Sequence, residues 1–133
     1  MTTRGIANNN PGNIRKSNIQ WQGEVPGADD LFETYEKPEY GIRAIFKILS
    51  YYYNKEHLCT IQEIINRWAP PTENNSVAYV ADVAARCNVP ADAVITPSEN
   101  FMKALVRAII WHENGQDPYS DDVINLAWKL ANG

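Results

Sequence analysis

The sequence has little cysteine and histidine, and it lacks the usual metal and phosphate motifs. Its 133 residues include two cysteines, Cys59 and Cys87, and two histidines. Two cysteines permit one disulfide without implying it, and we expect two free, mostly buried thiols. There is no H-E-x-x-H pattern, no cysteine pair at zinc spacing, no Gly-rich phosphate loop and no G-x-S-x-G turn. We therefore expect neither a metal site nor a cofactor.

Long apolar runs and clusters of positive charge are also missing. No run reaches the roughly 18 apolar residues that indicate a membrane span. The opening MTTRGIANNNPGNIR has no apolar core of a signal peptide. The net charge is −4, from 16 acidic and 12 basic residues, without a run rich in Lys and Arg. Because phosphate neutralisation needs clustered positive charge, we do not expect nucleic acid as the main partner.

The remaining composition is typical of one globular domain. Apolar residues make up 44% and charged residues 21% of the chain, and we expect a monomer with a single domain over residues 1–133. Residues 8–36 are rich in Asn, Gly and Pro, which predicts loops with a small hairpin. From residue 38 onward, apolar residues recur at spacings of three and four, which predicts helices. The fold class is therefore α+β, mainly α.

End signals place about five helices after the N-terminal region. Pro at the first helical position, capping boxes of the T-x-x-E type and a Ser cap are typical of helix starts. The predicted helices are PEYGIRAIFKILSYYY from Pro38, IQEIINRW after the Thr60–Glu63 box, NSVAYVADVAARC, the segment from the Thr96–Glu99 box to Gly115, and DDVINLAWKLA after Ser120.

The helix that ends in AIIWHENG carries an acid on its apolar face. On a wheel of about 100° per residue, Glu113 falls within the stripe that contains Met102 and Ile109. Desolvation by this stripe and the negative end of the helix dipole favour a protonated carboxyl, which can act as a general acid. Asn114–Gly115 then ends the helix, which places the acid at the lip of a cleft. The alternative is that the helix emerges from the core here and Glu113 meets water or an arginine.

Three stretches, NNPGNIR, PEYGIRA and RWAPPTEN, together resemble a family of lysozyme-like lytic proteins of phage virions and prophages. The resemblance spans nearly the whole chain and implies a lysozyme-like domain. The N-terminal block is more distantly similar to flagellar-type glucosaminidases, and ALVRAIIWHENG resembles the acid-bearing helix of lytic transglycosylases.

The order of these motifs departs from that fold family, in which the acid helix precedes the Asn-rich turn. Here seven residues precede Asn8 and none of them is acidic. A circularly permuted domain reconciles the two orders. It requires Gly115 and Asn8 to lie near each other, with Glu113 facing residues 8–13 and the strand from Glu33 to Tyr35.

The resemblance implies an enzyme that cleaves the MurNAc–GlcNAc strand of peptidoglycan, either a lytic transglycosylase or a muramidase, with Glu113 as general acid and base. Glycan strands of peptidoglycan would be the partner. The protein would reside in a phage virion, or in the host cytoplasm until it is released to the cell wall. A muropeptide endopeptidase and a non-catalytic wall-binding or virion structural protein are the alternative functions.

Other candidate residues each have a structural alternative. Glu33 is the best-placed second carboxylate, in LFETY, where alternation puts Phe32 on the opposite face; its alternative is a solvated strand face. By resemblance, Tyr79 positions the reacting sugar. For His112 we expect packing or helix capping. The substrate-binding candidates, with turns, core packing or helix capping as alternatives, are Asn8, Asn9, Asn10, Asn13, Trp21, Tyr35, Glu73 and Asn74.

Overall fold

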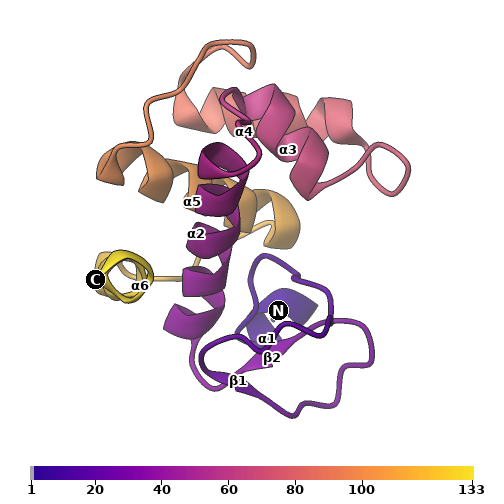
Figure 1. Ribbon diagram of the computed structural model, residues 1–133. Helices are drawn as coiled ribbons and strands as arrows, with labels where there is room; N and C mark the ends of the chain where they lie inside the picture. The colour runs from indigo at the N-terminus through magenta and orange to yellow at the C-terminus, as the bar shows by residue number, and fades with distance from the viewer. Residues whose placement is uncertain (1) are drawn as a thin grey trace.

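The computed structural model describes residues 2–133, which form six α-helices and one two-stranded sheet. The elements are α1 (Arg4–Ala7), β1 (Glu24–Val25), β2 (Thr34–Tyr35), α2 (Pro38–Asn54), α3 (Ile61–Trp68), α4 (Ser76–Cys87), α5 (Glu99–Asn114) and α6 (Asp121–Asn132). The mainly helical α+β class predicted from the sequence is confirmed (Figure 1).

Residues 2–36 form an N-terminal lobe of loops around a short antiparallel sheet. In this sheet Glu24 pairs with Tyr35 and Val25 pairs with Thr34. The predicted small hairpin is therefore confirmed. In Figure 1 the lobe lies beside the lower half of α2, and α3 and α4 lie beyond the upper end of that helix.

The short helix α1 was not predicted. It has four residues and no side-chain cap at its N-terminus, so the sequence carries none of the usual start signals. Thr3, which precedes it, instead donates its hydroxyl hydrogen to Oδ1 of Asn114 at 2.6 Å. The start of α1 is therefore held by a contact with the end of α5, and not by a local cap.

The central helix α2 carries much of the core. Ile42, Ile45 and Leu49 are fully buried on it, and α6 packs along one side (Figure 1). Its first turn passes against the Asn-rich turn of the N-terminal lobe. A Cβ atom on Gly41 would lie 1.9 Å from the backbone oxygen of Asn9, so the glycine of PEYGIRA permits this close approach.

Two predicted caps are confirmed, because Thr60 and Ser120 each accept a backbone hydrogen bond from the first turn of the helix they precede. Asn75, which we expected inside the next helix, caps α4 in the same way. The predicted start of α5 is wrong by two residues. Ser98, not Thr96, is its cap and accepts from the backbone N–H of Phe101, since a Ser directly before Glu99 satisfies that donor locally.

α5 is buried along most of its length, as the apolar stripe predicts, and it packs against α4. Two positions near its end depart from a simple apolar stripe. Trp111 is 40% exposed although it is aromatic, and Asn114 is 8% exposed although it is polar. Within residues 2–133, no helix has both the length and the apolar character that crossing a membrane requires.

Candidate active site

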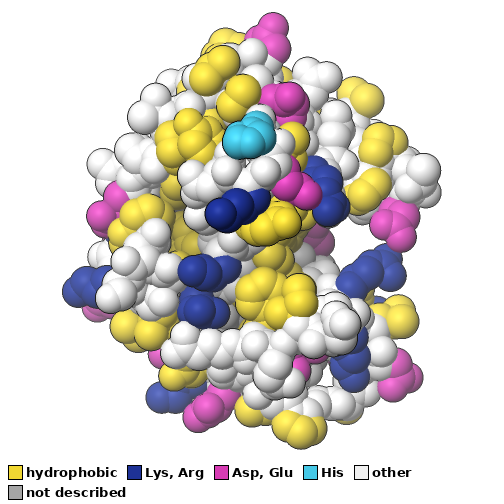
Figure 2. Space-filling model, viewed as in Figure 1, with side chains coloured by type: hydrophobic (Ala, Val, Ile, Leu, Met, Phe, Trp, Pro, Cys, Tyr) yellow, Lys and Arg dark blue, Asp and Glu magenta, His cyan; other side chains and the backbone are white. Residues whose placement is uncertain are grey.

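A cleft of about 530 Å³ separates the N-terminal lobe from the helical part of the chain. Figure 2 shows this face hollowed between two lobes at the right of the view. The walls come from four places in the sequence: the turn after Asn10 with Phe32, the α2 residues Ile48 and Tyr52, the end of α3 with the following loop to Asn74, and Glu113 at the end of α5. Glu113 therefore lies at a cleft, as the sequence predicts.

Both carboxylate oxygens of Glu113 accept hydrogen bonds. Asn13 donates its side-chain N–H to Oε1 at 2.8 Å. The hydroxyl of Tyr79 donates to Oε2 at 2.7 Å. The carboxylate is half-buried, and it is fixed between the N-terminal lobe and α4. This arrangement holds the carboxylate of Glu113 in a defined orientation at the edge of the cleft.

Tyr79 is kept as a hydrogen-bond donor by its surroundings. Its side chain is 2% exposed. Burial first, and then the charge of Glu113, raise the pKa of Tyr79 far above its ordinary value, although a hydrogen bond with Trp68 lowers it in part. The phenol therefore stays protonated and can only support Glu113 by donating. The structure brings these two predicted residues together.

His112 stacks on Tyr79 with ring centroids 3.8 Å apart and an angle of 28° between the planes. Its Nδ1 lies 2.9 Å from Oδ2 of Asp82. Burial raises the pKa of Asp82, but the hydrogen bond with His112 and the charge of Arg86 outweigh it, and the pKa ends below its usual range. His112 thus packs behind the phenol, in keeping with the packing role expected for it.

The end of α5 is tied to the N-terminal lobe next to the acid. Asn114 donates to the backbone oxygens of Pro11 at 2.8 Å and Ile110 at 2.9 Å. A Cβ atom on Gly5 would lie 2.8 Å from Oδ1 of both Asn13 and Asn114, so a side chain there would push both amides. The two segments that a permuted domain must bring together are therefore in contact.

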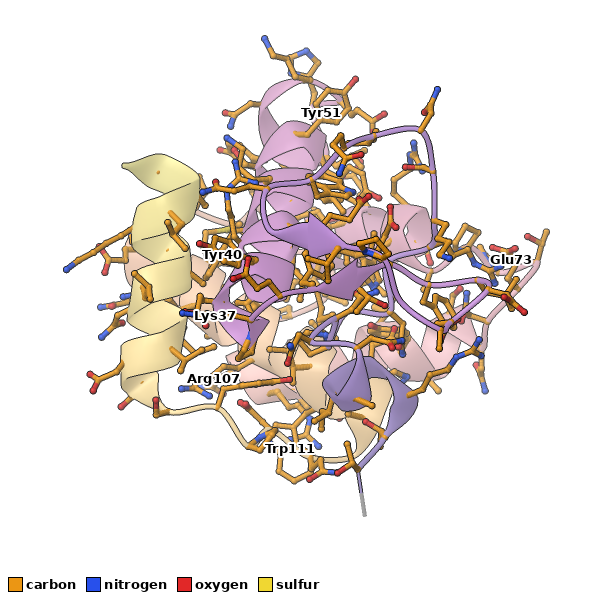
Figure 3. The ribbon with its side chains drawn as sticks, turned by 90° about the horizontal axis from the view of Figure 1, so that it is seen from below. Lys37, Tyr40, Tyr51, Glu73, Arg107 and Trp111 are labelled. Carbon is orange, nitrogen blue, oxygen red and sulfur yellow. The ribbon has the colours of Figure 1, made fainter. Side chains whose placement is uncertain are left out.

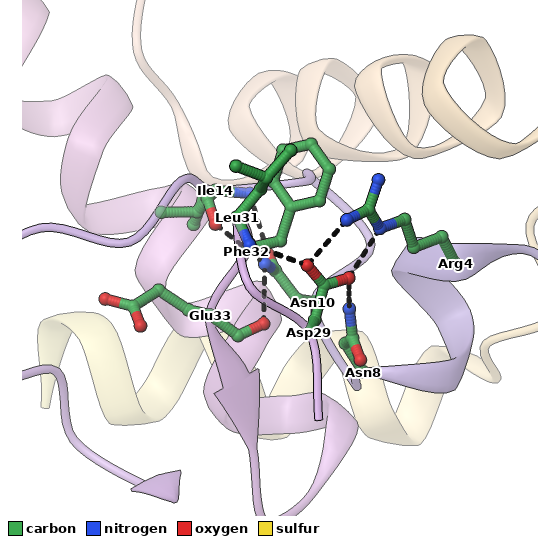
Figure 4. Close-up of polar contacts among 8 residues, drawn as sticks. All are labelled: Arg4, Asn8, Asn10, Ile14, Asp29, Leu31, Phe32 and Glu33. Carbon is green, nitrogen blue, oxygen red and sulfur yellow. Dashed lines mark hydrogen bonds and ion pairs between the residues drawn. The ribbon is translucent and has the colours of Figure 1, made fainter. Parts of the chain in front are cut away.

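The Asn-rich turn contributes one side chain, Asn13, to the cleft. Asn8 donates to Asp29 at 3.0 Å and Asn9 donates to the backbone oxygen of Tyr35 at 3.0 Å. Asn10 is fully buried and donates to the backbone oxygens of Ile14 and Glu33, both at 2.9 Å (Figure 4). The amides of Asn8, Asn9 and Asn10 hold the turn together. Full burial keeps Asn10 from contacting a substrate, and substrate binding by Asn8 and Asn9 stays a prediction.

Asp29 organises the loop beside this turn. Arg4 pairs with it through two N–H groups, and it also accepts the backbone N–H groups of Leu31 and Phe32 (Figure 4). The hydrogen bond with Arg4 is the main reason that the pKa of Asp29 lies well below its usual range. This carboxylate is engaged on several sides and serves the lobe's structure.

The strand prediction is half right. Phe32 lines the Glu113 cleft, whereas Glu33 faces a separate hollow with Glu24. Figure 4 shows the Glu33 carboxylate directed away from Phe32 and Ile14. Tyr35 is 1% exposed and belongs to the core. Three predictions are therefore wrong. The Glu33–Tyr35 strand does not face Glu113, Glu33 is not a catalytic partner in that cleft, and Tyr35 does not stack on a sugar. The alternation put Glu33 opposite Phe32, and the fold turned Phe32 toward the cleft.

The remaining candidates lie at different distances from the acid. Trp21 is half-buried against the core and does not line the cleft, so substrate binding by Trp21 stays a prediction. Asn74 lines the cleft. Glu73, at the outer edge of the molecule in Figure 3, lies 3.9 Å from the guanidinium of Arg15. Both of these side chains are exposed, so we expect little stabilisation from their ion pair.

Sequence reasoning missed several residues of the cleft wall. They are the aromatic side chains of Phe32, Tyr52 and Trp68 and the cations Arg15 and Arg67. Trp68 had a usable signal, because it ends a helix directly before the A-P-P loop, where binding residues often gather. The two cysteines, Cys59 and Cys87, are both free and partly exposed.

Comparison with known proteins places the chain among phage proteins. No protein-family model matches it. Protein P5 of Pseudoalteromonas phage PM2 is 38% identical to it over 130 residues, a stretch that covers 95% of this chain and 80% of the phage protein. The name of that relative states no activity. At this identity and coverage, the chain belongs to the family of Protein P5 of phage PM2.

Proposed function

We propose that the protein is a lysozyme-like enzyme that cleaves the MurNAc–GlcNAc strand of peptidoglycan, with Glu113 as its general acid and base. The observation that carries the proposal is the setting of Glu113. It lies half-buried at a cleft of about 530 Å³, with both oxygens held by Asn13 and Tyr79. The contact between α5 and the Asn-rich turn supports a permuted arrangement of the lysozyme-like motifs.

The cleft favours a one-carboxyl mechanism. Within residues 2–133, no second Asp or Glu lines this cleft, whereas hydrolases of the usual type place two carboxyl groups about 5–9.5 Å apart. In the proposed reaction Glu113 protonates the glycosidic oxygen as the C1–O4 bond breaks. The 6-hydroxyl of the same MurNAc residue then attacks C1 and returns its proton to Glu113. The products are a 1,6-anhydro end and a free 4-hydroxyl, as in a lytic transglycosylase.

The cleft walls suit a sugar chain that bears carboxylates. Phe32 and Trp68 offer apolar surface to pyranose rings, and Asn74 offers hydrogen bonds to hydroxyl or acetamido groups. Arg15, from the N-terminal lobe, and Arg67, from the end of α3, add positive charge to the cleft, and Arg67 is also 3.2 Å from Oε1 of Glu56. We assign them to the carboxylates of the peptide stems, because guanidinium groups match carboxylate geometry.

The phage relative supports a role in the virion or during host lysis. Storage in a virion, or in the host cytoplasm before release to the wall, is the location we propose. A non-catalytic virion protein is the second candidate, since the name of the relative specifies no reaction. An endopeptidase is the third, and it shares the same cleft.

The deciding experiment replaces Glu113 and identifies the products. Purified protein is incubated with peptidoglycan sacculi, and the soluble muropeptides are analysed by mass spectrometry. We expect 1,6-anhydro muropeptides from the wild type and at least a roughly 100-fold lower rate from Glu113→Gln. Glu99→Gln, at the exposed start of the same helix, is the matched control and should keep its activity.

Each other result selects a different function. Reducing MurNAc ends would indicate a hydrolase, and cut stem peptides with intact glycan would indicate an endopeptidase. No soluble product from folded wild type, together with sedimentation on sacculi, would indicate a binding protein. Equal activity of Glu113→Gln and wild type would remove Glu113 from the mechanism.

A further inference from the structure

A second pair of carboxyl groups lies on the N-terminal lobe, outside the Glu113 cleft. Glu33 and Glu24 line a separate hollow of about 340 Å³ together with Ser17 and Gln20. The register of the small sheet explains why they meet. Glu24 is paired with Tyr35, so Glu33, two residues before Tyr35, is its diagonal neighbour on the same face.

One oxygen of the Glu33 carboxylate is an unsatisfied hydrogen-bond acceptor. Its side chain belongs to a residue that is 4% exposed, and its Oε2 has no hydrogen-bond donor. A buried carboxylate is costly unless it is paired with an opposite charge, coordinates a metal or takes up a proton. Burial first, and then the hydrogen bond with Glu24 and the charge of Glu24, raise the pKa of Glu33, while the backbone N–H of Ser17 and the charge of Lys16 lower it in part. The neighbour across the sheet is a second acid, Glu24, and Lys16, an exposed cation, also lines the hollow.

The hollow is rich in oxygen. Besides the two carboxylates, the hydroxyl of Ser17 and the amide oxygen of Gln20 come from its lining residues. Oxygen ligands of this kind suit hard cations, whereas zinc prefers nitrogen and sulfur. Ca²⁺ accepts irregular sets of six to eight oxygens, including water, while Mg²⁺ demands near-octahedral geometry. An irregular loop with two carboxylates therefore fits Ca²⁺ better than Mg²⁺.

We propose that Glu24 and Glu33 bind a calcium ion in this hollow. The ion would join the loop of residues 16–27 to the strand that follows it, and would give Oε2 of Glu33 the partner that it lacks. Among residues 2–133, no site offers three or more acidic, Cys or His ligands. With two carboxylates we expect weak binding, with Kd on the order of 1 mM, as in extracellular modules.

This site is linked to the Glu113 cleft through the backbone. Asn10 donates to the backbone oxygen of Glu33, and the backbone N–H of Glu33 donates to the oxygen of Ile14. These bonds hold the turn on which Asn13 reaches Glu113. Calcium should therefore stabilise the lobe that carries Asn13. The inference does not depend on the reaction proposed above.

Thermal unfolding tests the site directly. Protein dialysed against EDTA and returned to chelator-free buffer is heated with 10 mM CaCl2, with 10 mM MgCl2, or with NaCl at matched ionic strength. We expect Ca²⁺ to raise the Tm of the wild type by about 4 °C over NaCl, and Mg²⁺ to raise it by less than half as much. Glu33→Gln and Glu24→Gln should each lose most of the Ca²⁺ shift, while Glu36→Gln, exposed just beyond the strand, should keep it.

Each outcome of the melts either supports or overturns the calcium site. If Glu33→Gln does not fold, the partly exposed Glu24→Gln decides the question alone. Equal shifts with Ca²⁺, Mg²⁺ and NaCl in the wild type would overturn the proposal, as would an undiminished Ca²⁺ shift in Glu24→Gln. Loss of glycan cleavage in Glu113→Gln has no bearing on this test, so failure of the proposed function and failure of the calcium site are distinguishable.

Discussion

Tyr79 donates its hydroxyl hydrogen to Oε2 of Glu113 at 2.7 Å, across 34 residues of sequence. The bond joins the middle of the chain to the end of α5. It leaves the acid with one oxygen oriented by α4 and the other by the N-terminal lobe through Asn13. If Glu113 transfers protons, this geometry makes Tyr79 a positioning residue for it.

Replacing Tyr79 with Phe should lower glycan cleavage about 10- to 100-fold while the fold stays intact. The ring can remain stacked on His112, but the bond to the carboxylate is lost, and such bonds contribute about 1.5–3 kcal/mol. The effect should fall on kcat more than on KM, with an altered pH–rate profile, measured by release of muropeptides. Tyr53→Phe, on α2, is the control. An unchanged kcat in Tyr79→Phe would show that the bond plays no part in the reaction.

Asn10→Ala should destabilise the protein by about 2–4 kcal/mol, measured by urea unfolding. Asn10 is fully buried, donates to two backbone oxygens and accepts the N–H of Ile14 at 3.0 Å. Removing it leaves those buried groups without partners, which costs more than the bonds themselves. Asn18→Ala, on an exposed loop, should change stability little. A loss below about 0.5 kcal/mol for Asn10→Ala would contradict the structural role assigned to the turn.

Asp29 should make stability depend on pH in the acid range. Its pKa is lowered in the folded state, chiefly by the hydrogen bond with Arg4. A group with a lowered pKa stabilises the fold fully above its unfolded value, near 3.8, and that stabilisation declines as the pH falls from there towards the folded pKa. We therefore expect Asp29→Asn to lower Tm at pH 7 and to lower it by a smaller amount at pH 2.5.

The control for Asp29 is Asp30→Asn, an exposed neighbour, followed in the same melts. Its Tm should track that of the wild type across the pH range. An Asp29→Asn deficit that is as large at pH 2.5 as at pH 7 would show that packing, and not charge, accounts for the effect.

Local sequence signals predicted where the helices lie. They did not predict which distant residues contact the helix ends. The spacing of Met102, Ile109 and Glu113 placed the acid on the apolar face, and Asn114–Gly115 marked the end of the helix, which Gly115 closes with φ 68°. The burial of Asn114 does not follow from the wheel, because a wheel contains nothing about the N-terminal segment that Asn114 binds.

The strand shows a similar limit. Alternation put Phe32 and Glu33 on opposite faces, and the structure agrees. Which of those faces turns to the cleft depends on long-range contacts, such as the bond from Asn10 to the backbone of Glu33. Likewise, the Asn-rich turn is recognisable from its composition. The role of each amide depends on which group lies opposite it after folding.

The contacts that close the candidate site join residues 100, 103 and 111 positions apart. Contacts this distant form late, because the intervening chain must first be ordered. During synthesis the Asn-rich turn leaves the ribosome long before α5 exists, so a nascent or truncated chain that stops short of Glu113 contains no site at all. If the protein degrades its host's cell wall as proposed, it would become active only after almost the whole chain has been made.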